Sequence, residues 1–291
     1  MYPSQFEYRE ATSVDEAIDL LTDNADAETE ILAGGHSLIP TMKSGLASPD
    51  VLIDLGGIQG LRGIDHGDGV TTIGAMTPYA DIAGDDTLHQ HAEVLAEAAA
   101  AVGDIQVRNM GTIGGNLAHA DPASDLPAAA LAADATLVIQ GRDGERSVSA
   151  DDFFLGMYTT DVGDEELVTR VEVPHQPSGA GGAYVKKASP SSGYAMVGVA
   201  AAVEAEGGEI TAARVAANGA LDHASRLEPV EEALVDEGLD TDIAEGAGEH
   251  ATDEVEEWEL MDDLQASAEF RGHLLEVYAG RAIEAAIERA G

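Results

Sequence analysis

Two short stretches, Ala33-Gly34-Gly35-His36-Ser37 and Thr112-Ile113-Gly114-Gly115-Asn116, decide how this sequence folds and what it can bind. Each contains a pair of glycines, and the first directly follows the apolar residues Ile31-Leu32. Paired glycines let consecutive main-chain N–H groups converge on one point and bind an anion without a basic side chain. We therefore predict that the two turns bind phosphate groups and together hold the two halves of a diphosphate.

The alternative is that both stretches are ordinary tight turns, because a chain of 291 residues with 33 glycines supplies such pairs by chance. The charge of the chain bears on this choice. Fourteen Lys and Arg stand against 55 Asp and Glu, which gives a formal net charge of −41. An anion site in such a chain must rely on main-chain donors. The same imbalance argues against nucleic acid as a partner, since binding its phosphates requires clustered Lys and Arg.

The acidic residues are spread along the whole chain, and only three lysines are present, Lys43, Lys186 and Lys187. The hydrophobic content of 44% is too high for a disordered acidic tail. We expect a globular protein of two or three packed parts that is adapted to a halophilic cytoplasm, where salt screens the charge repulsion. An ordinary acidic protein is the alternative. The sequence shows neither a signal-peptide pattern nor an apolar run of about 18 residues, so we predict a cytoplasmic protein without a membrane span.

Cysteine is absent, which excludes disulfides, thiolate nucleophiles and iron–sulfur clusters held by this chain alone. Redox chemistry would therefore require an organic cofactor. The P-loop, the dinucleotide fingerprint that follows a strand, and the nucleophile elbow are also missing. His89 and His91 alternate in direction and indicate solvated surface, so we predict no metal site.

The apolar patterns predict strands and helices that alternate in the first part of the chain and segregate in the second. In the first part, strands are expected over residues 29–33, 51–55, 69–75, 135–140 and 166–173, and helices over residues 87–102 and 125–133. A stretch rich in Pro and Gly, residues 174–182, is the expected linker. Strands over residues 183–187, 195–204 and 209–218 follow, and then helices from about residue 228, the last over residues 267–290. This order indicates the α+β class.

Taken together, the two turns resemble the paired FAD-diphosphate loops of PCMH-type flavin domains. The chain as a whole resembles the medium, FAD-binding subunits of molybdenum hydroxylases, the family of carbon monoxide dehydrogenase and xanthine dehydrogenase. Further matching stretches extend over nearly the entire chain: Ile73–Thr77, Asp121–Pro127, Tyr184–Lys186, Gly193–Ala200 and Ala266–Arg271. The resemblance implies a two-part PCMH-type FAD-binding domain over residues 1–176, with sub-domains of about 1–56 and 57–176. It also implies a C-terminal domain over residues 177–291, made of a three-stranded antiparallel sheet and a helical bundle.

The resemblance implies a role for each matching position around a non-covalent FAD. The main chains of residues 33–37 and 112–116 would hold the diphosphate. Asp125 would accept hydrogen bonds from ribose or ribityl hydroxyls, because a carboxylate beside the diphosphate would repel it. Lys186 would stabilise the negative charge of a reduced flavin. The alternatives are a helix N-terminal charge for Asp125 and a surface position for Lys186.

Two further positions are expected near the flavin ring. Tyr194 matches an aromatic position that lies against the isoalloxazine in some relatives, where it would shield the ring. Its alternative role is that of a core tyrosine. Thr77 would lie close to the ring.

In this family, a large subunit carries molybdopterin and oxidises the substrate, and a small subunit carries [2Fe-2S] clusters. The resemblance therefore implies an oxidoreductase subunit that collects electrons on FAD and passes them to an external acceptor, within a dimer of heterotrimers. Such a subunit requires no catalytic base or nucleophile of its own. Two alternatives remain: a stand-alone FAD-dependent oxidase or dehydrogenase, and a non-enzymatic assembly subunit. The substrate could be carbon monoxide, a purine, an aldehyde or an aromatic compound.

Overall fold

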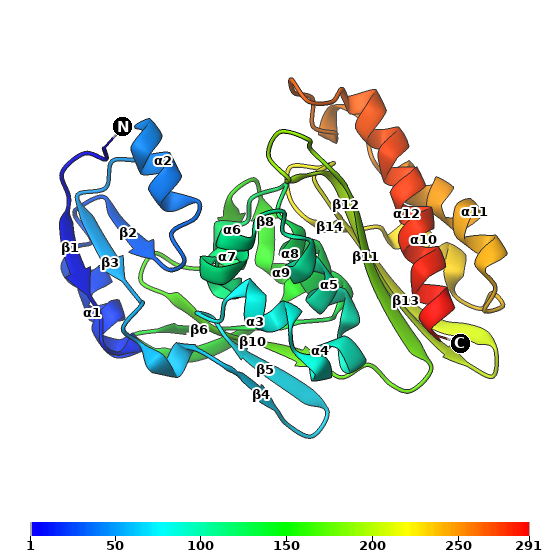
Figure 1. Ribbon diagram of the computed structural model, residues 1–291, viewed down its shortest axis with the longest axis horizontal. Helices are drawn as coiled ribbons and strands as arrows, with labels where there is room; N and C mark the ends of the chain where they lie inside the picture. The colour runs from blue at the N-terminus through cyan, green and yellow to red at the C-terminus, as the bar shows by residue number, and fades with distance from the viewer. Residues whose placement is uncertain (1, 291) are drawn as a thin grey trace.

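Three β-sheets follow one another along the long axis of the molecule, in the order of the sequence (Figure 1). The computed structural model describes residues 2–290. We refer to its parts as the N-terminal, central and C-terminal sheets, each with the helices that cover it.

The N-terminal sheet is parallel, with β3 (Val51–Asp54) between β1 (Glu7–Glu10) and β2 (Thr29–Leu32). Its connections contain α1 (Val14–Asp23) and α2 (Leu38–Ser44). Three of the four residues of β3 are buried, whereas all four of β1 are exposed at the edge. The first glycine turn directly follows β2, at the carboxyl edge of a parallel sheet, where ligands of such sheets bind.

The central sheet is antiparallel and has the strand order β4-β5-β10-β6-β7. Its strands are β4 (Ile64–His66), β5 (Val70–Gly74), β10 (Leu167–Pro174), β6 (Thr136–Gly141) and β7 (Gly144–Ser149). The helices of this part are α3 (Tyr79–Ala83), α4 (Asp86–His91), α5 (Glu93–Ala101), α6 (Ile105–Met110), α7 (Ile113–His119), α8 (Asp125–Ala132) and α9 (Ala150–Phe153). A small hairpin, β8 (Phe154–Gly156) and β9 (Thr159–Thr160), follows α9. The largest apolar core lies in this part of the chain and includes the fully buried Leu95, Leu117 and Leu126.

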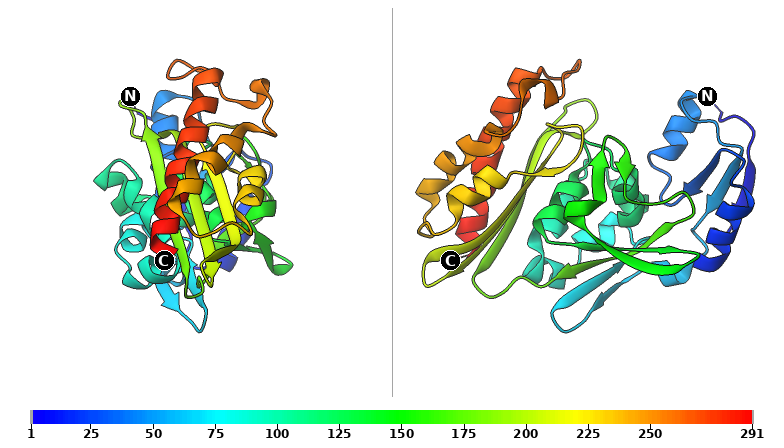
Figure 2. Two further views of the ribbon diagram at one scale, coloured as in Figure 1. Left: turned by 90° about the vertical axis from the view of Figure 1, so that its right-hand side faces the viewer. Right: turned by 180° about the vertical axis from the view of Figure 1, so that it is seen from behind.

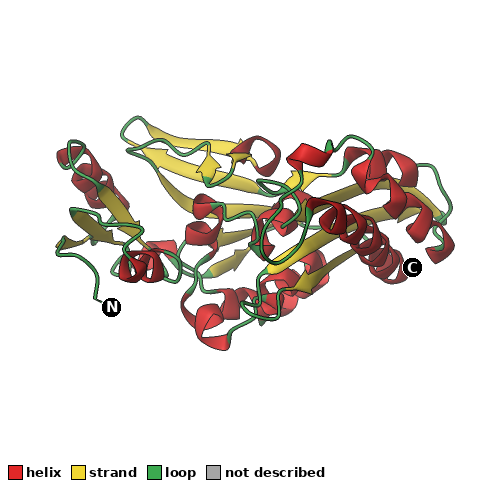
Figure 3. Cartoon of the chain, turned by 90° about the horizontal axis from the view of Figure 1, so that it is seen from above, coloured by secondary structure: helices red, strands yellow, loops and turns green. Residues whose placement is uncertain are grey.

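The C-terminal sheet is antiparallel and lies between two layers of helices (Figures 2 and 3). It contains β11 (Ala180–Ala188), β12 (Ala195–Glu206), β13 (Glu209–Asn218) and β14 (Ser225–Arg226). One face packs on α12 (Ala268–Ala290), and α10 (Glu228–Leu234) and α11 (Ala244–Gly248) belong to the same layer. The other face packs on α5 and α8 of the central part. Burial on both faces explains why β12 is a continuous apolar run from Ala195 to Val203.

The α+β class and most of the expected elements are confirmed, with three differences. The expected helix over residues 87–102 is interrupted at Ala92, where φ is −153°, so that α4 ends and α5 begins there. The irregular linker is shorter than expected, because β10 continues to Pro174 and β11 already begins at Ala180. The short β14 adds a fourth strand to the three expected in the C-terminal sheet. Within residues 2–290, no helix has both the length and the apolar character that crossing a bilayer requires.

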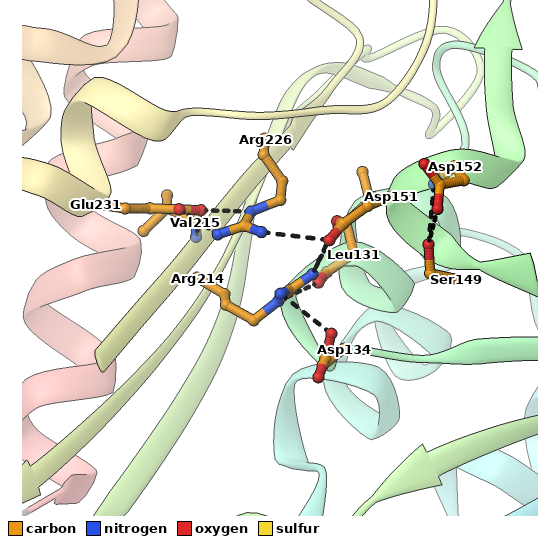
Figure 4. A network of polar contacts seen from close by, with 9 residues as sticks. All are labelled: Leu131, Asp134, Ser149, Asp151, Asp152, Arg214, Val215, Arg226 and Glu231. Atoms are coloured by element: carbon orange, nitrogen blue, oxygen red, sulfur yellow. Dashed lines mark hydrogen bonds and ion pairs between the residues drawn. The ribbon is translucent and has the colours of Figure 1, made fainter. Parts of the chain in front are cut away.

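Two arginines join the C-terminal sheet to the central part (Figure 4). Arg214 on β13 donates to both carboxylate oxygens of Asp151 at 2.8 Å and to the carbonyl of Leu131 at 2.9 Å. Arg226 on β14 donates hydrogen bonds to the carboxylate of Glu231 and, at 3.3 Å, to that of Asp151. Arginine holds a carboxylate with a fixed geometry, so this network fixes α8 and α9 relative to β13.

We expect Arg214→Met to lower the free energy of unfolding by about 1–2 kcal/mol, because it removes charged hydrogen bonds at a partly buried joint. Arg142→Met is the matched control. Arg142 is half exposed and makes one 3.5 Å contact with Asp19, so its loss should cost about 0.5 kcal/mol or less. Urea unfolding at one fixed salt concentration measures both variants. Equal losses of unfolding free energy in the two variants would show that the Arg214 network does not stabilise the contact between the C-terminal sheet and the central part.

Candidate cofactor site

The two glycine turns lie in direct contact, although they are far apart in the sequence. A Cβ atom on Gly34 would lie 2.3 Å from the carbonyl oxygen of Met110 and 2.7 Å from Cα of Gly111. A Cβ atom on Gly115 would lie 3.0 Å from Cβ of Ala33. Any side chain at Gly34 would therefore push the N-terminal sheet away from the central part.

A cleft of about 350 Å³ opens where the turns meet. It is lined by most of the residues expected to bind the cofactor and by several others: Glu30, Ile31, Ala33, Gly34, Gly35, His36, Ser37, Leu38, Thr41, Ala47, Tyr79, Gly111, Thr112, Gly115, Asn116, Ala118 and His119. This lining contains no Lys or Arg. An anion held in the cleft must therefore be bound mainly by main-chain N–H groups and hydroxyls.

The first turn offers such donors. Gly35 is in the left-handed region, with φ of +71°, and the bond from Ile39 N to its carbonyl oxygen (3.1 Å) is the first helical bond of α2. The N–H groups of the intervening residues therefore have no partner within the helix. Throughout residues 2–290, no hydrogen bond uses the N–H groups of residues 34–37. The first turn thus has N–H groups free for an anion, and its binding of phosphate stays a prediction.

The second turn differs from the expectation, because its N–H groups already have acceptors within the protein. The N–H groups of Ile113, Gly114, Gly115 and Asn116 donate, at 2.8–3.3 Å, to Thr77 O, Ala75 O, Thr112 Oγ1 and Thr112 O. Thr112 caps α7 by accepting from Gly115 N with its hydroxyl and from Asn116 N with its carbonyl, and the carbonyls of Ala75 and Thr77, distant in the sequence, accept the other two donors. The turn therefore contributes the shape of the cleft and the side chains of Thr112 and Asn116. Direct contact of its amides with a diphosphate stays a prediction.

Three of the expected residues lie below the surface of the cleft. Ile113 and Gly114 are buried, and a Cβ atom on Gly114 would lie 2.4 Å from Cβ of Ala75. Thr77 is fully buried, and its hydroxyl exchanges two 3.0 Å hydrogen bonds with the backbone of Gly63. Thr77 thus supports the second turn from beneath, and its contact with the flavin ring stays a prediction.

Asp125 and Lys186 form a buried pair where the central part meets the C-terminal sheet. Lys186 Nζ lies 2.8 Å from Asp125 Oδ2, and the hydroxyl of Tyr184 donates to Asp125 Oδ1 at 2.6 Å. Burial raises the pKa of Asp125, and the charge of Lys186 opposes this shift. A surface position for Lys186 is excluded by this geometry. The contacts of both residues with FAD stay predictions.

Tyr194 is placed beside the first turn. It lies in the connection between β11 and β12, and 44% of it is exposed, so it is not a core tyrosine. Partial burial and the nearby carboxylate of Asp121 raise its pKa, and the Ser37 side chain lies close enough to oppose that shift. The C-terminal part of the chain therefore approaches the first turn through this tyrosine, although Tyr194 is not among the residues that line the cleft.

The sequence analysis missed nine residues of the cleft, and three of these have titratable side chains: Glu30, Tyr79 and His119. Tyr79 is the most informative of them. It is buried under the second turn, where a Cβ atom on Gly111 would lie 2.5 Å from its ring, and burial raises its pKa. The sequence did contain a signal for Tyr79, because it directly follows Thr77-Pro78 just after a predicted strand, close to a residue expected at the cofactor.

Comparison with known proteins identifies the family. Residues 4–176 match the model of the FAD binding domain in molybdopterin dehydrogenase, and residues 183–286 match the CO dehydrogenase flavoprotein C-terminal domain. The chain belongs to the FAD-binding family of the molybdopterin dehydrogenases. The resemblance described from the sequence is thereby confirmed, and FAD is the cofactor of this chain.

Relatives within this FAD-binding family cover the full length of the chain. It is 35% identical to the glyceraldehyde dehydrogenase medium chain of Sulfolobus acidocaldarius, over 98% of this chain and 99% of the relative. It is also 35% identical to the carbon monoxide dehydrogenase medium chain of Hydrogenophaga pseudoflava, over 99% of both chains. The solved carbon monoxide dehydrogenase of Hydrogenophaga pseudoflava contains a chain that matches with a TM-score of 0.93, 37% identity and 98% of both chains covered.

The residues of the cleft fit the cofactor of the family. The diphosphate of FAD is an anion, and the first turn offers unpaired N–H groups in a cleft whose lining contains no Lys or Arg. The approach of Gly34 and Gly115 to the opposite turn keeps the cleft narrow.

We expect Gly34→Ala to weaken FAD binding strongly, because the added methyl group collides with backbone atoms of residues 110–111. Overpacking of this kind costs about 1–3 kcal/mol, which corresponds to a loss of affinity of about 5- to 150-fold. Flavin absorbance after gel filtration, followed by titration with FAD, measures the loss. Gly246→Ala in α11 is the control, because a Cβ atom there meets nothing within 4 Å. Unchanged affinity in Gly34→Ala would contradict the assignment of the cleft.

Proposed function

We propose that this chain is the FAD-carrying electron-transfer subunit of a molybdenum hydroxylase complex. It accepts electrons from an iron–sulfur subunit and passes them to an external acceptor. The observation that supports the proposal is a cleft between two glycine turns, the first of which has unpaired main-chain N–H groups, in a chain that aligns over 98–99% of its length with medium chains of dehydrogenases.

The residues of the chain bind and orient the cofactor, and FAD supplies the ability to take up electrons singly and to release them as a pair. The first turn holds the diphosphate through its N–H groups. Thr112 and Asn116 shape the opposite side of the cleft, and Tyr194 covers the side nearest the C-terminal sheet. No proton has to be removed from a substrate here, so the chain requires no general base.

The partners follow from the same chemistry. A chain without cysteine cannot supply the ligands of a [2Fe-2S] cluster, so the clusters lie on a small subunit and the molybdopterin on a large one. We propose a dimer of such heterotrimers in a cytoplasm of high salt, where the net charge of −41 is screened. We also propose domain boundaries of 1–176, with sub-domains of about 1–56 and 57–176, and 177–291.

The substrate is chosen by the large subunit. Two relatives that match this chain equally well carry the names of different substrates, glyceraldehyde and carbon monoxide. The overall similarity of this chain therefore does not favour either substrate. The two alternative functions have less support: the relatives named are chains of multi-subunit enzymes, and a degenerate flavin site would not retain the contacts of Gly34 and Gly115.

Co-expression with its large and small subunits tests the proposal. We expect a yellow complex whose flavin is reduced by substrate only when the small subunit is present. Anaerobic absorbance spectra of the complex, with and without the small subunit, measure this dependence. A yellow chain that turns over a substrate alone would support a stand-alone oxidase, and a chain that never binds FAD would support an assembly role.

A further inference from the structure

We propose that Lys186 is a positioning residue that acts on the flavin site through Tyr194, and not through its own charge. This inference rests on the proposed function, since it concerns how the chain completes its FAD site. It is carried by the contacts of the Lys186 ammonium group, which join three segments of the chain.

The ammonium group of Lys186 is neutralised and enclosed. Only 10% of the Lys186 side chain and 6% of the Asp125 side chain are exposed. Two of its three donors are used, toward Asp125 Oδ2 at 2.8 Å and the carbonyl oxygen of Gly193 at 2.9 Å. A cation that is paired with a buried carboxylate has little net charge left to offer a flavin.

The contact with Gly193 anchors the bend that presents Tyr194. Gly193 has φ of +77° and donates its N–H to Ser189 O, and Ser189 N donates to Tyr194 O, at 2.9 and 2.7 Å. The following residue, Ala195, donates to Ala123 O in the central part at 3.2 Å. Lys186 adds a side-chain hydrogen bond to this bend, because its ammonium group donates to the carbonyl oxygen of Gly193, directly before Tyr194.

The bend is also packed against the central part. A Cβ atom on Gly103 would lie 3.2 Å from Cα of Gly193, so the two backbones approach closely. Asp125 begins α8 in the same part of the molecule. The pair of Asp125 and Lys186 therefore fixes the β11–β12 bend relative to the cleft, and Tyr194 stands at its end beside Ser37.

A double-mutant cycle separates this role from a direct effect of charge. The dissociation constant for FAD is measured by flavin fluorescence for the wild type, Lys186→Met, Tyr194→Ala and the double variant. Each single change should raise the constant up to about tenfold, the value of one aromatic contact. The double variant should bind no more weakly than Tyr194→Ala alone. Effects that multiply in the double variant would overturn the proposal.

A second variant is needed because Lys186→Met leaves Asp125 buried without its cation and could destabilise the fold. We choose Gly193→Ala. It strains the bend at φ of +77° and leaves the ion pair intact. We expect both Gly193→Ala and Lys186→Met to weaken FAD binding and to raise the fluorescence of bound flavin, and the strain in Gly193→Ala should lower the melting temperature by no more than about 2–4 °C. A folded Gly193→Ala protein with wild-type affinity and fluorescence would overturn the proposal. Wild-type protein that binds no FAD would refute the proposed function itself, whereas multiplying effects in FAD-binding protein refute only the role of Lys186.

Discussion

The approach of Gly34 to the backbone of residues 110–111 is the contact on which the rest of the site depends. It brings the carboxyl edge of a parallel sheet against the helical layer of an antiparallel one. Only a residue without a Cβ atom permits this distance, so two parts with separate cores share one cleft. The unpaired amides of the first turn lie at a cleft because the second turn closes the space opposite them.

The distribution of positive charge is the second constraint. The chain has 14 Lys and Arg, and several of them are used where parts of the structure meet: Lys186 between α8 and β11, and Arg214 and Arg226 between β13, β14 and α9. The cleft lining contains no Lys or Arg. Main-chain donors suit such a chain, because they do not titrate and their geometry is set by the fold.

The sequence predicted those features that are encoded locally. The turns, the strand of residues 209–218 and the last helix follow from glycine pairs and from apolar periodicity. The break at Ala92 carries no Gly or Pro signal, and the exposed strand β1 has no apolar pattern, since it is held by its pairing with β3. The hydrogen bonds of the second turn could not be predicted either, because two of its four N–H groups donate to the carbonyls of residues 75 and 77, which only the fold brings near.

The C-terminal sheet explains why this site can be rigid. A strand such as β12, apolar from Ala195 to Val203, is buried between α12 on one side and α5 and α8 on the other. Its small side chains let both helical layers approach closely, and the arginine network of β13 and β14 holds the same joint. A connection that begins and ends in such a sheet has fixed ends. Tyr194 lies in this connection, so its main chain is held in one position beside the first turn.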